Sequence, residues 1–114
     1  MSTDLTELNK LEAWLMLHRI QYERKDLPAI YGEKGLIIRL EKHQICVPVE
    51  NVAEKSWDAI CHPGSYGYEQ GLLEIMGDLV DCKKDGDTVV GYLTAEEVIE
   101  RFKNYGNHRK RSNR

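Results

Sequence analysis

The sequence predicts one α+β domain, in which a small, mainly antiparallel sheet of about four or five strands packs with three helices. Three observations lead to this prediction. Helix-type apolar spacing opens and closes the chain, several strand-like segments follow one another between these ends, and turn residues separate those segments. The predicted order is helix, three strands, a short strand, helix, strand and helix.

The first predicted element is a helix that ends near Arg19. Asp4 precedes it and Glu7 follows three residues later, which is the spacing of a capping box. Leucines at three- and four-residue intervals form one apolar stripe: Leu5, Leu8, Leu11 and Leu15. The stripe predicts that this helix packs on the sheet.

Residues 20–24 alternate in polarity and predict a strand, and Pro28 and Gly32 then break the chain. Residues 36–40 are rich in β-branched side chains and predict the second strand. A turn at residues 41–43 is expected to lead into a third strand at 44–49, which gives an antiparallel hairpin.

Pro48 has no backbone N–H to donate, so the third strand is expected at a sheet edge or to end there. The polar residues 51–56 predict a loop. Residues 57–61 then predict a short strand that places Trp57, Ala59 and Cys61 on one face, with Asp58 and Ile60 on the other.

A glycine-rich loop is predicted over residues 62–71, and helical spacing resumes at residues 72–80 with Leu72, Leu73, Met76 and Val80. Gly71 and Gly77 weaken such a helix by roughly 1 kcal/mol each. Their presence suggests that another segment packs closely there.

Residues 83–87 predict a turn and residues 88–92 a strand. The last helix is the most clearly marked element of the sequence. Thr94 stands three residues before Glu97, as in a capping box, and Gly106 stands where a C-terminal cap is expected.

Length and charge divide the chain into a body and a tail. With 114 residues the chain fits one domain, predicted over residues 1–106. Residues 107–114 are expected to be a basic, disordered tail that carries Arg109, Lys110, Arg111 and Arg114. Without these four residues, the chain has 12 basic and 19 acidic residues, which gives a net charge of −7. Nucleic-acid binding is therefore expected, if at all, through the tail.

The start of the chain lacks the basic and apolar regions of a signal peptide, and no apolar run is long enough to cross a bilayer. We therefore expect a cytoplasmic protein without a membrane partner. The odd number of cysteines fits reduced, partly buried thiols better than a disulfide framework: Cys46, Cys61 and Cys82.

The loop at residues 62–71 and the residues beside it form the predicted binding surface for a protein or small ligand: Trp57, His62, Ser65, Tyr66, Tyr68 and Glu69. Tyrosines and tryptophan are enriched at interfaces because they combine an apolar body with a polar tip. Tyr92 belongs to the same aromatic group. An alternative is that the loop holds a nucleotide or another anion, although no Lys or Arg lies nearby in the sequence.

No catalytic constellation is predicted. Cys61 and His62 are adjacent on a strand, so they face opposite ways and cannot serve each other as nucleophile and base. Glu69 and Glu74 are five residues apart, which does not place paired acids on one helical face. Zinc ligands normally come in close pairs. Only Cys61 with His62 and His43 with Cys46 come near such a spacing, so neither a metal nor a cofactor is expected.

Four segments together resemble short uncharacterised proteins of prophages and mobile elements of Gram-positive bacteria: residues 57–62 (WDAICH), 64–67 (GSYG), 71–77 (GLLEIMG) and 90–98 (VGYLTAEEV). The resemblance covers residues 57–102 and assigns no site residue. It implies a bacterial host cell and a phage-linked context, in which small acidic proteins bind host proteins, including defence systems.

The sequence therefore predicts a small non-enzymatic binding protein that contacts a host or phage protein, with a possible anti-defence role. Two alternatives stay open, a nucleotide or anion binder that uses the 62–71 loop, and a nucleic-acid binder that uses the basic tail. An exposed sheet edge also makes a homodimer possible.

Overall fold

The structure is a computed structural model that describes residues 3–48 and 55–112, and side chains at residues 3–48 and 56–105. Its helices are α1 (Thr6–Leu17), α2 (Cys82–Asp85) and α3 (Ala95–Ser112). The main sheet contains β1 (Glu23–Leu27), β4 (Lys42–Pro48), β5 (Lys55–Ile60), β6 (Leu73–Gly77) and β7 (Val89–Leu93). A separate pair consists of β2 (Ile30–Tyr31) and β3 (Ile37–Arg39), and short 3₁₀ turns cover Glu33–Gly35 and Tyr68–Gln70.

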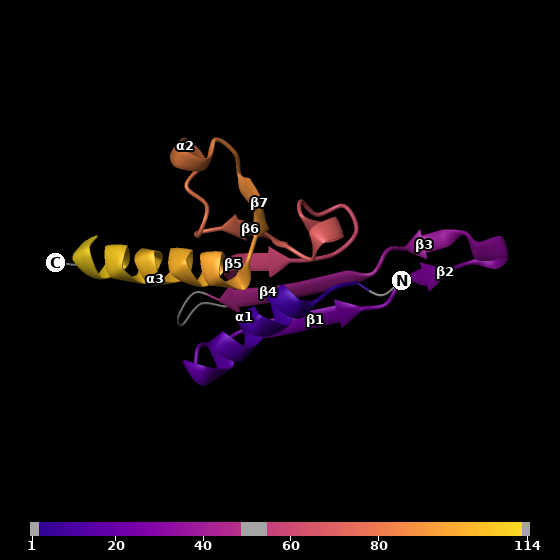
Figure 1. Cartoon of the computed structure of the whole chain (residues 1–114), viewed down its shortest axis with the longest axis horizontal. Coiled ribbons are helices and arrows are strands. Elements are labelled where there is room, and N and C mark those ends of the chain that lie inside the picture. Colours follow the sequence, from indigo (N-terminus) through magenta and orange to yellow (C-terminus); the bar gives the residue numbers. More distant parts are fainter. Residues whose placement is uncertain (1–2, 49–54, 113–114) are drawn as a thin grey trace.

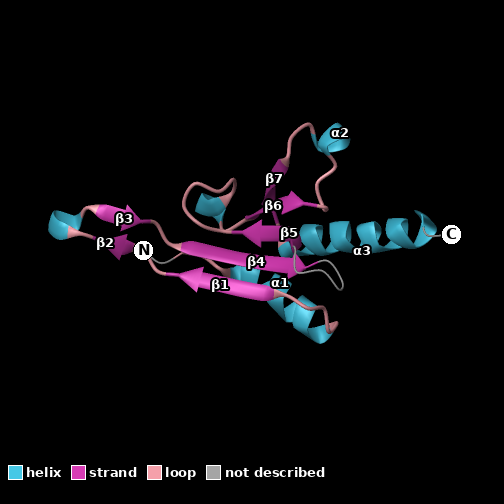
Figure 2. Cartoon of the chain, turned by 180° about the vertical axis from the view of Figure 1, so that it is seen from behind, coloured by secondary structure: helices cyan, strands magenta, loops and turns pink. Residues whose placement is uncertain are grey.

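The predicted fold class is confirmed, because the structure is α+β with an antiparallel five-stranded sheet in the order β1-β4-β5-β6-β7. Helix α1 lies in front of β1 and β4 in Figure 1 and behind them in Figure 2, so it covers one face of the sheet. Leu8, Leu11 and Leu15 of α1 are fully buried there, as the leucine stripe predicts.

The core lies between this face of the sheet and the helices α1 and α3. Strand residues Ile45, Trp57 and Ile75 are at most 1% exposed, and Val98 of α3 is fully buried. The prediction that Trp57, Ala59 and Cys61 share one face of the strand is confirmed, since all three belong to this core. Apolar burial of this kind is the main stabilising contribution to such a domain.

The predicted hairpin between residues 36–40 and 44–49 is wrong. β4 pairs with β1 and with β5, whereas β3 pairs with β2. The chain does not reverse at residues 41–43, which contain no turn residue. It reverses at Glu33–Gly35, where Lys34 and Gly35 have φ of 58° and 76°.

β1 and β4 are therefore the base of one long hairpin, and β2 and β3 form its tip. We call residues 28–40 the ribbon arm, which projects from the body of the molecule in Figure 1. β1 begins at Glu23, three residues later than predicted, because its pairing with β4 runs from Glu23 opposite Cys46 to Leu27 opposite Lys42. Pro48 is the last residue of β4, which lies inside the sheet and not at its edge.

The helix predicted at residues 72–80 is also wrong, because Leu73–Gly77 form β6. Gly71 and Gly77 have φ of 71° and 100°, which a helix does not accommodate. A side chain at Gly77 would place its Cβ 2.5 Å from the backbone oxygen of Ser56, so β5 approaches this position closely. The expectation that another segment packs against these glycines was therefore correct.

The two predicted capping boxes differ in outcome. At α3 the hydroxyl of Thr94 accepts from the N–H of Glu97 at 3.2 Å, and a Glu97 carboxylate oxygen accepts from the N–H of Thr94 at 3.0 Å, so this box is confirmed. At α1 the carboxylate of Asp4 accepts from the N–H of Thr6. Glu7 instead accepts from the N–H of Ala95 at 2.8 Å and so joins the starts of the two helices.

Helix α3 continues past the end predicted at Gly106 and reaches Ser112. Glycine permits a C-terminal cap without requiring one, and basic residues favour the C-terminal end of a helix. The side chains of Arg109, Lys110 and Arg111 lie outside those described, as does all of Arg114. Among the described residues, none of the helices combines the length and apolarity that a membrane crossing requires.

Candidate functional site

The loop between β5 and β6 is held by a turn around Ser65. The hydroxyl of Ser65 donates to the backbone oxygen of His62 at 2.7 Å and accepts from the N–H of His62 at 3.1 Å. The N–H of Ser65 donates to the same oxygen at 2.9 Å. Ser65, a predicted binding residue, therefore acts mainly by fixing the loop.

The loop is also joined to β7, because the N–H of Tyr92 donates to the backbone oxygen of Tyr66 at 3.2 Å. Glycine makes this contact possible. A Cβ on Gly91 would lie 2.2 Å from the Cβ of Tyr66, and a Cβ on Gly67 would lie 3.0 Å from the backbone of Tyr92. Larger residues at either glycine would therefore separate the loop from β7.

This contact places two exposed tyrosine rings side by side. The ring centroids of Tyr66 and Tyr92 are 6.5 Å apart, and the ring planes differ by 27°. The two residues are 54% and 58% exposed. Tyr92 adopts φ of 60°, which is rare for a non-glycine residue, and such conformations persist only where the surroundings hold them.

A buried carboxylate fixes the Tyr66 side of the pair. Glu74 of β6 is 9% exposed, and its side chain accepts from the N–H of Tyr66 at 2.9 Å. A buried carboxyl group without a hydrogen-bond partner would be unfavourable. Glu74 is thus a structural anchor, and Glu69 on the exposed side of the loop does not pair with it as an acid–base couple.

The loop residues 64–70 and Tyr92 line a shallow hollow of about 230 Å³. Tyr66 and Glu69 are exposed beside it, whereas Ser65 and Tyr68 are half-buried. Glu69 carries the only full charge among the described residues that line the hollow. The hollow therefore combines aromatic rings with one carboxylate.

Tyr68 connects the loop to the base of the ribbon arm. Its hydroxyl donates to the carboxylate of Glu41 at 3.2 Å, and the hydroxyl of Thr3 also donates to that carboxylate. The hydrogen bond from Thr3 is the main cause that lowers the pKa of Glu41. The loop and the arm consequently belong to one end of the molecule.

His43 lies between two carboxylates at this junction. Its Nδ1 is 2.7 Å from Asp26 and its Nε2 is 2.7 Å from Glu41. Burial acts to lower the pKa of His43, but the hydrogen bonds to Asp26 and Glu41 outweigh it and raise that pKa above its ordinary value. When the imidazole is protonated, it donates to both carboxylates and so ties β1 to β4 where the arm begins.

His62 and Cys61 do not form a reactive pair. The Nδ1 of His62 accepts from the backbone N–H of His43 at 3.3 Å, and burial lowers the His62 pKa. The Sγ of Cys61 points to the backbone oxygen of Asp4, and burial raises the pKa of this thiol. A thiol with a raised pKa is a poor nucleophile.

Trp57 belongs to the core and not to the predicted binding surface. It is 1% exposed, and its ring lies 5.5 Å from that of Phe102 of α3. The buried indole Nε1 has no hydrogen-bond partner among the described residues. The large side chain of Trp57 and its position on the inner face of β5 explain why this residue is buried.

The cysteines have different surroundings. Cys61 is buried, Cys46 is half-buried and Cys82 is exposed, so the expectation of partial burial is wrong for Cys82. Within residues 3–48 and 55–112, no group of three or more His, Cys, Asp or Glu side chains is placed to hold a metal ion.

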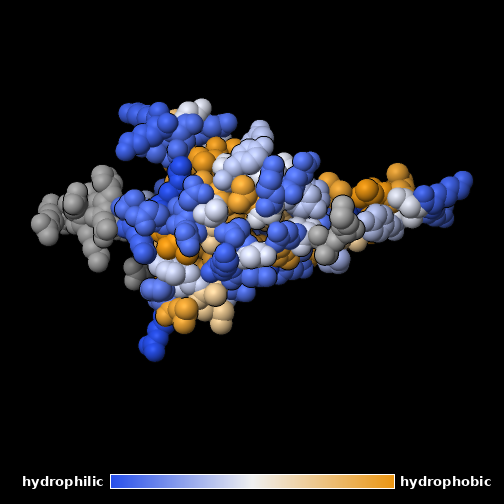
Figure 3. Space-filling model, viewed as in Figure 1, coloured by the Kyte–Doolittle hydropathy of each residue, from blue (hydrophilic) through white to orange (hydrophobic). Residues whose placement is uncertain are grey.

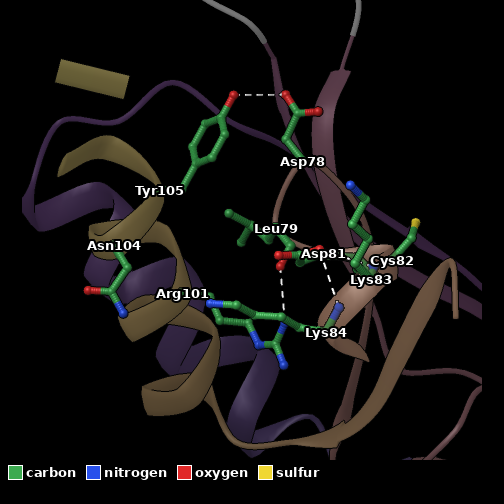
Figure 4. Close-up of a pocket in the computed structure, with 10 residues that line it drawn as sticks. Asp78, Leu79, Asp81, Cys82, Lys83, Lys84, Arg101, Asn104 and Tyr105 are labelled. Carbon is green, nitrogen blue, oxygen red and sulfur yellow. Dashed lines mark hydrogen bonds between the residues drawn. The ribbon is translucent and has the colours of Figure 1, made fainter. Parts of the chain in front are cut away.

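A larger groove of about 700 Å³ lies between the α2 region and α3 (Figure 4). Two pairs of polar groups at this groove satisfy each other. The guanidinium of Arg101 donates to both carboxylate oxygens of Asp85 at 3.0 and 3.1 Å, and the hydroxyl of Tyr105 donates to Asp78 at 3.0 Å. The side chains of Lys83, Lys84 and Asn104 line the same groove.

The ribbon arm carries an exposed apolar surface that was not among the predicted site residues. Its large apolar side chains are 41–69% exposed: Ile30, Tyr31, Leu36, Ile37, Ile38 and Leu40. Figure 3 shows this apolar colour on the projecting arm, with hydrophilic residues at the tip. The unbroken apolar run at residues 36–38 was the available signal, since an alternating strand would expose only one apolar face.

Comparison with protein-family models, with curated proteins and with solved structures finds no match to this chain.

Proposed function

We propose that this chain is a non-enzymatic binding protein that contacts a protein partner through the ribbon arm and the adjacent 62–71 loop. The observation that carries the proposal is the apolar arm. Single exposed apolar residues are common, but a contiguous apolar projection is typical of a surface that another molecule covers.

The construction of the arm favours the same function. β2 and β3 form a two-stranded ribbon, and such ribbons are marginally stable alone in water. Successive residues of a strand point to opposite faces, so Leu36, Ile37 and Ile38 make both faces of the arm apolar. Each strand also has a free edge among the described residues, to which a partner strand can bind.

Surface chemistry favours a protein over the alternatives. The hollow beside Tyr66 is lined by the carboxylate of Glu69 and by no Lys or Arg, which disfavours a nucleotide or another anion. The candidate nucleophile Cys61 is buried. The mobile-element context and an anti-defence role remain part of the proposal, with the resemblance over residues 57–102 as their support.

Affinity capture with the full chain tests this proposal. The wild-type protein is immobilised and exposed to a lysate of a Gram-positive bacterium, and bound proteins are identified by mass spectrometry. The arm variant carries Leu36→Ser and Ile38→Ser, and we expect it to lose the captured protein. The matched control carries Met16→Ser and Leu17→Ser at exposed apolar positions of α1 (62% and 80% exposed), and it should capture as the wild type does.

Capture that is unchanged in a folded arm variant would contradict the proposal. Analytical ultracentrifugation of the purified protein examines a second copy as the partner. A dimer that forms with rising concentration and disappears in the arm variant would identify the arm as a self-association surface.

A further inference from the structure

The tyrosine pair of the loop is held in place before any ligand binds. Two backbone hydrogen bonds fix it, from Tyr92 to Tyr66 and from Tyr66 to the buried Glu74. Gly91 and Gly67 allow the two segments to touch. Because the backbone on both sides is fixed, a ligand would have to order only the side-chain torsions of the two rings on binding.

The rings are available to solvent although they are large and aromatic. Tyr66 is 54% and Tyr92 is 58% exposed, and neither hydroxyl forms a hydrogen bond to another described residue. The left-handed backbone of Tyr92 keeps its ring beside that of Tyr66. The neighbouring segments fix the backbone of both residues, but they bury neither ring.

The chemistry of the hollow selects a positive charge. The face of an aromatic ring carries a partial negative charge that attracts ammonium and guanidinium groups. Glu69, which lines the same hollow, adds a full negative charge. The whole chain has a formal net charge of −3, which also favours cations over anions.

We propose that the hollow between Tyr66, Tyr92 and Glu69 binds an arginine or lysine side chain presented by the protein partner. This inference rests on the proposed function, because it names the chemistry of the partner. A guanidinium group suits the site best, since its flat face stacks on a tyrosine ring while its N–H groups donate to a carboxylate.

The test uses the full chain and a defined peptide, acetyl-Gly-Arg-Gly-Arg-Gly-amide, at low ionic strength. Binding is followed by NMR through the backbone amide resonances of residues 64–70 and 92, which remain observable in every variant. We expect saturable shifts at millimolar peptide, and no shifts with the corresponding peptide in which Glu replaces Arg. Glu69→Gln should weaken binding about twofold to fivefold and reduce its dependence on salt.

A matched pair of double variants isolates the role of the rings. Tyr66→Phe with Tyr92→Phe keeps both aromatic faces, so its affinity should stay within about twofold of the wild type. Tyr66→Leu with Tyr92→Leu keeps apolar bulk but removes the faces, so we expect affinity to fall at least about threefold. Equal affinities of the two variants, or equal binding of the Arg and Glu peptides, would overturn the inference.

The arm variant separates this inference from the proposed function. Leu36→Ser with Ile38→Ser should still bind the arginine peptide, because neither residue lines the hollow. Absence of peptide binding by the wild type would overturn the inference while capture through the arm persists. Capture that persists in the folded arm variant, together with intact peptide binding, would instead overturn the role of the arm.

Discussion

The base and the tip of the β1–β4 hairpin belong to one continuous stretch of chain, yet they present opposite chemistry to solvent. At the base, the edge strand β1 exposes Glu23, Lys25 and Asp26, and charges on an edge strand oppose pairing with other chains. At the tip, Leu36 and Ile38 are 69% and 65% exposed. The molecule therefore protects its sheet edge and leaves its arm available for contact.

The largest expected difference between the two regions concerns stability. Ile45→Ala at the base removes a fully buried side chain and should lower the free energy of unfolding by about 2–5 kcal/mol. Ile38→Ala at the tip makes the same chemical change and should cost about 0.5 kcal/mol or less. Urea denaturation measures both, and similar costs would show that the arm is part of the core.

Removal of the arm tests whether the base folds without the tip. Leu27 pairs with Lys42, so an Asn-Gly turn can replace residues 28–41. We expect the free energy of unfolding to change by about 1 kcal/mol or less, because a shorter loop offsets part of the lost Glu41 hydrogen bonds. If circular dichroism shows that the shortened chain is unfolded, the base of the hairpin does not fold independently of the tip.

The junction between base and tip should respond to pH through His43. Its folded pKa is raised above the ordinary 6.5, so the folded state binds the proton more tightly. The contribution of His43 to the free energy of unfolding is fully present below pH 6.5 and is lost as pH rises through the pKa of the folded state. The pKa values of Asp26 and Glu41 are lowered, so both stay ionised in this range.

His43→Gln should therefore reduce the free energy of unfolding by about 1 kcal/mol or less near pH 6, and by less at higher pH. Thermal or urea denaturation of both proteins across pH 6 to 9 measures this difference. A constant difference over the whole range would show that the imidazole charge makes no contribution.

The smallest expected change in stability follows from a charge on the arm. Ile38→Lys should leave the free energy of unfolding within about 0.5 kcal/mol of the wild type, because the position is exposed. The same variant should bind less of an apolar fluorescent dye. Dye binding equal to that of the wild type would place the accessible apolar surface elsewhere.

Local signals in the sequence predict several elements that short-range interactions decide, although the Asp4–Glu7 capping box is not formed. The Thr94–Glu97 box and the leucine stripe of α1 depend on neighbours within one or two helical turns, and both are present. The 62–71 loop was also predicted, and Tyr66 and Glu69 are exposed there. Trp57 was misplaced because its residue type suits an interface and a core equally.

Pairing between strands was harder to predict because it depends on contacts distant in sequence. The spacing of Leu72, Leu73 and Met76 fits a helix as well as a strand. The close approach of β5 at Gly77, visible only in the fold, excludes the helix. Likewise, the turn at Glu33–Gly35 decides which segments pair, and Gly32 and Gly35 were the signal for it.

The projecting arm and α3, which extend to opposite ends of the molecule in Figure 1, also govern how the molecule moves through solvent. The molecule measures 60 × 29 × 23 Å, and its radius of gyration of 15.3 Å exceeds the roughly 13 Å typical of a compact chain of this length. Such an elongated particle experiences more friction than a sphere of equal mass. The monomer should therefore elute early in gel filtration, at a volume that suggests a heavier particle, and light scattering should return the mass of one chain.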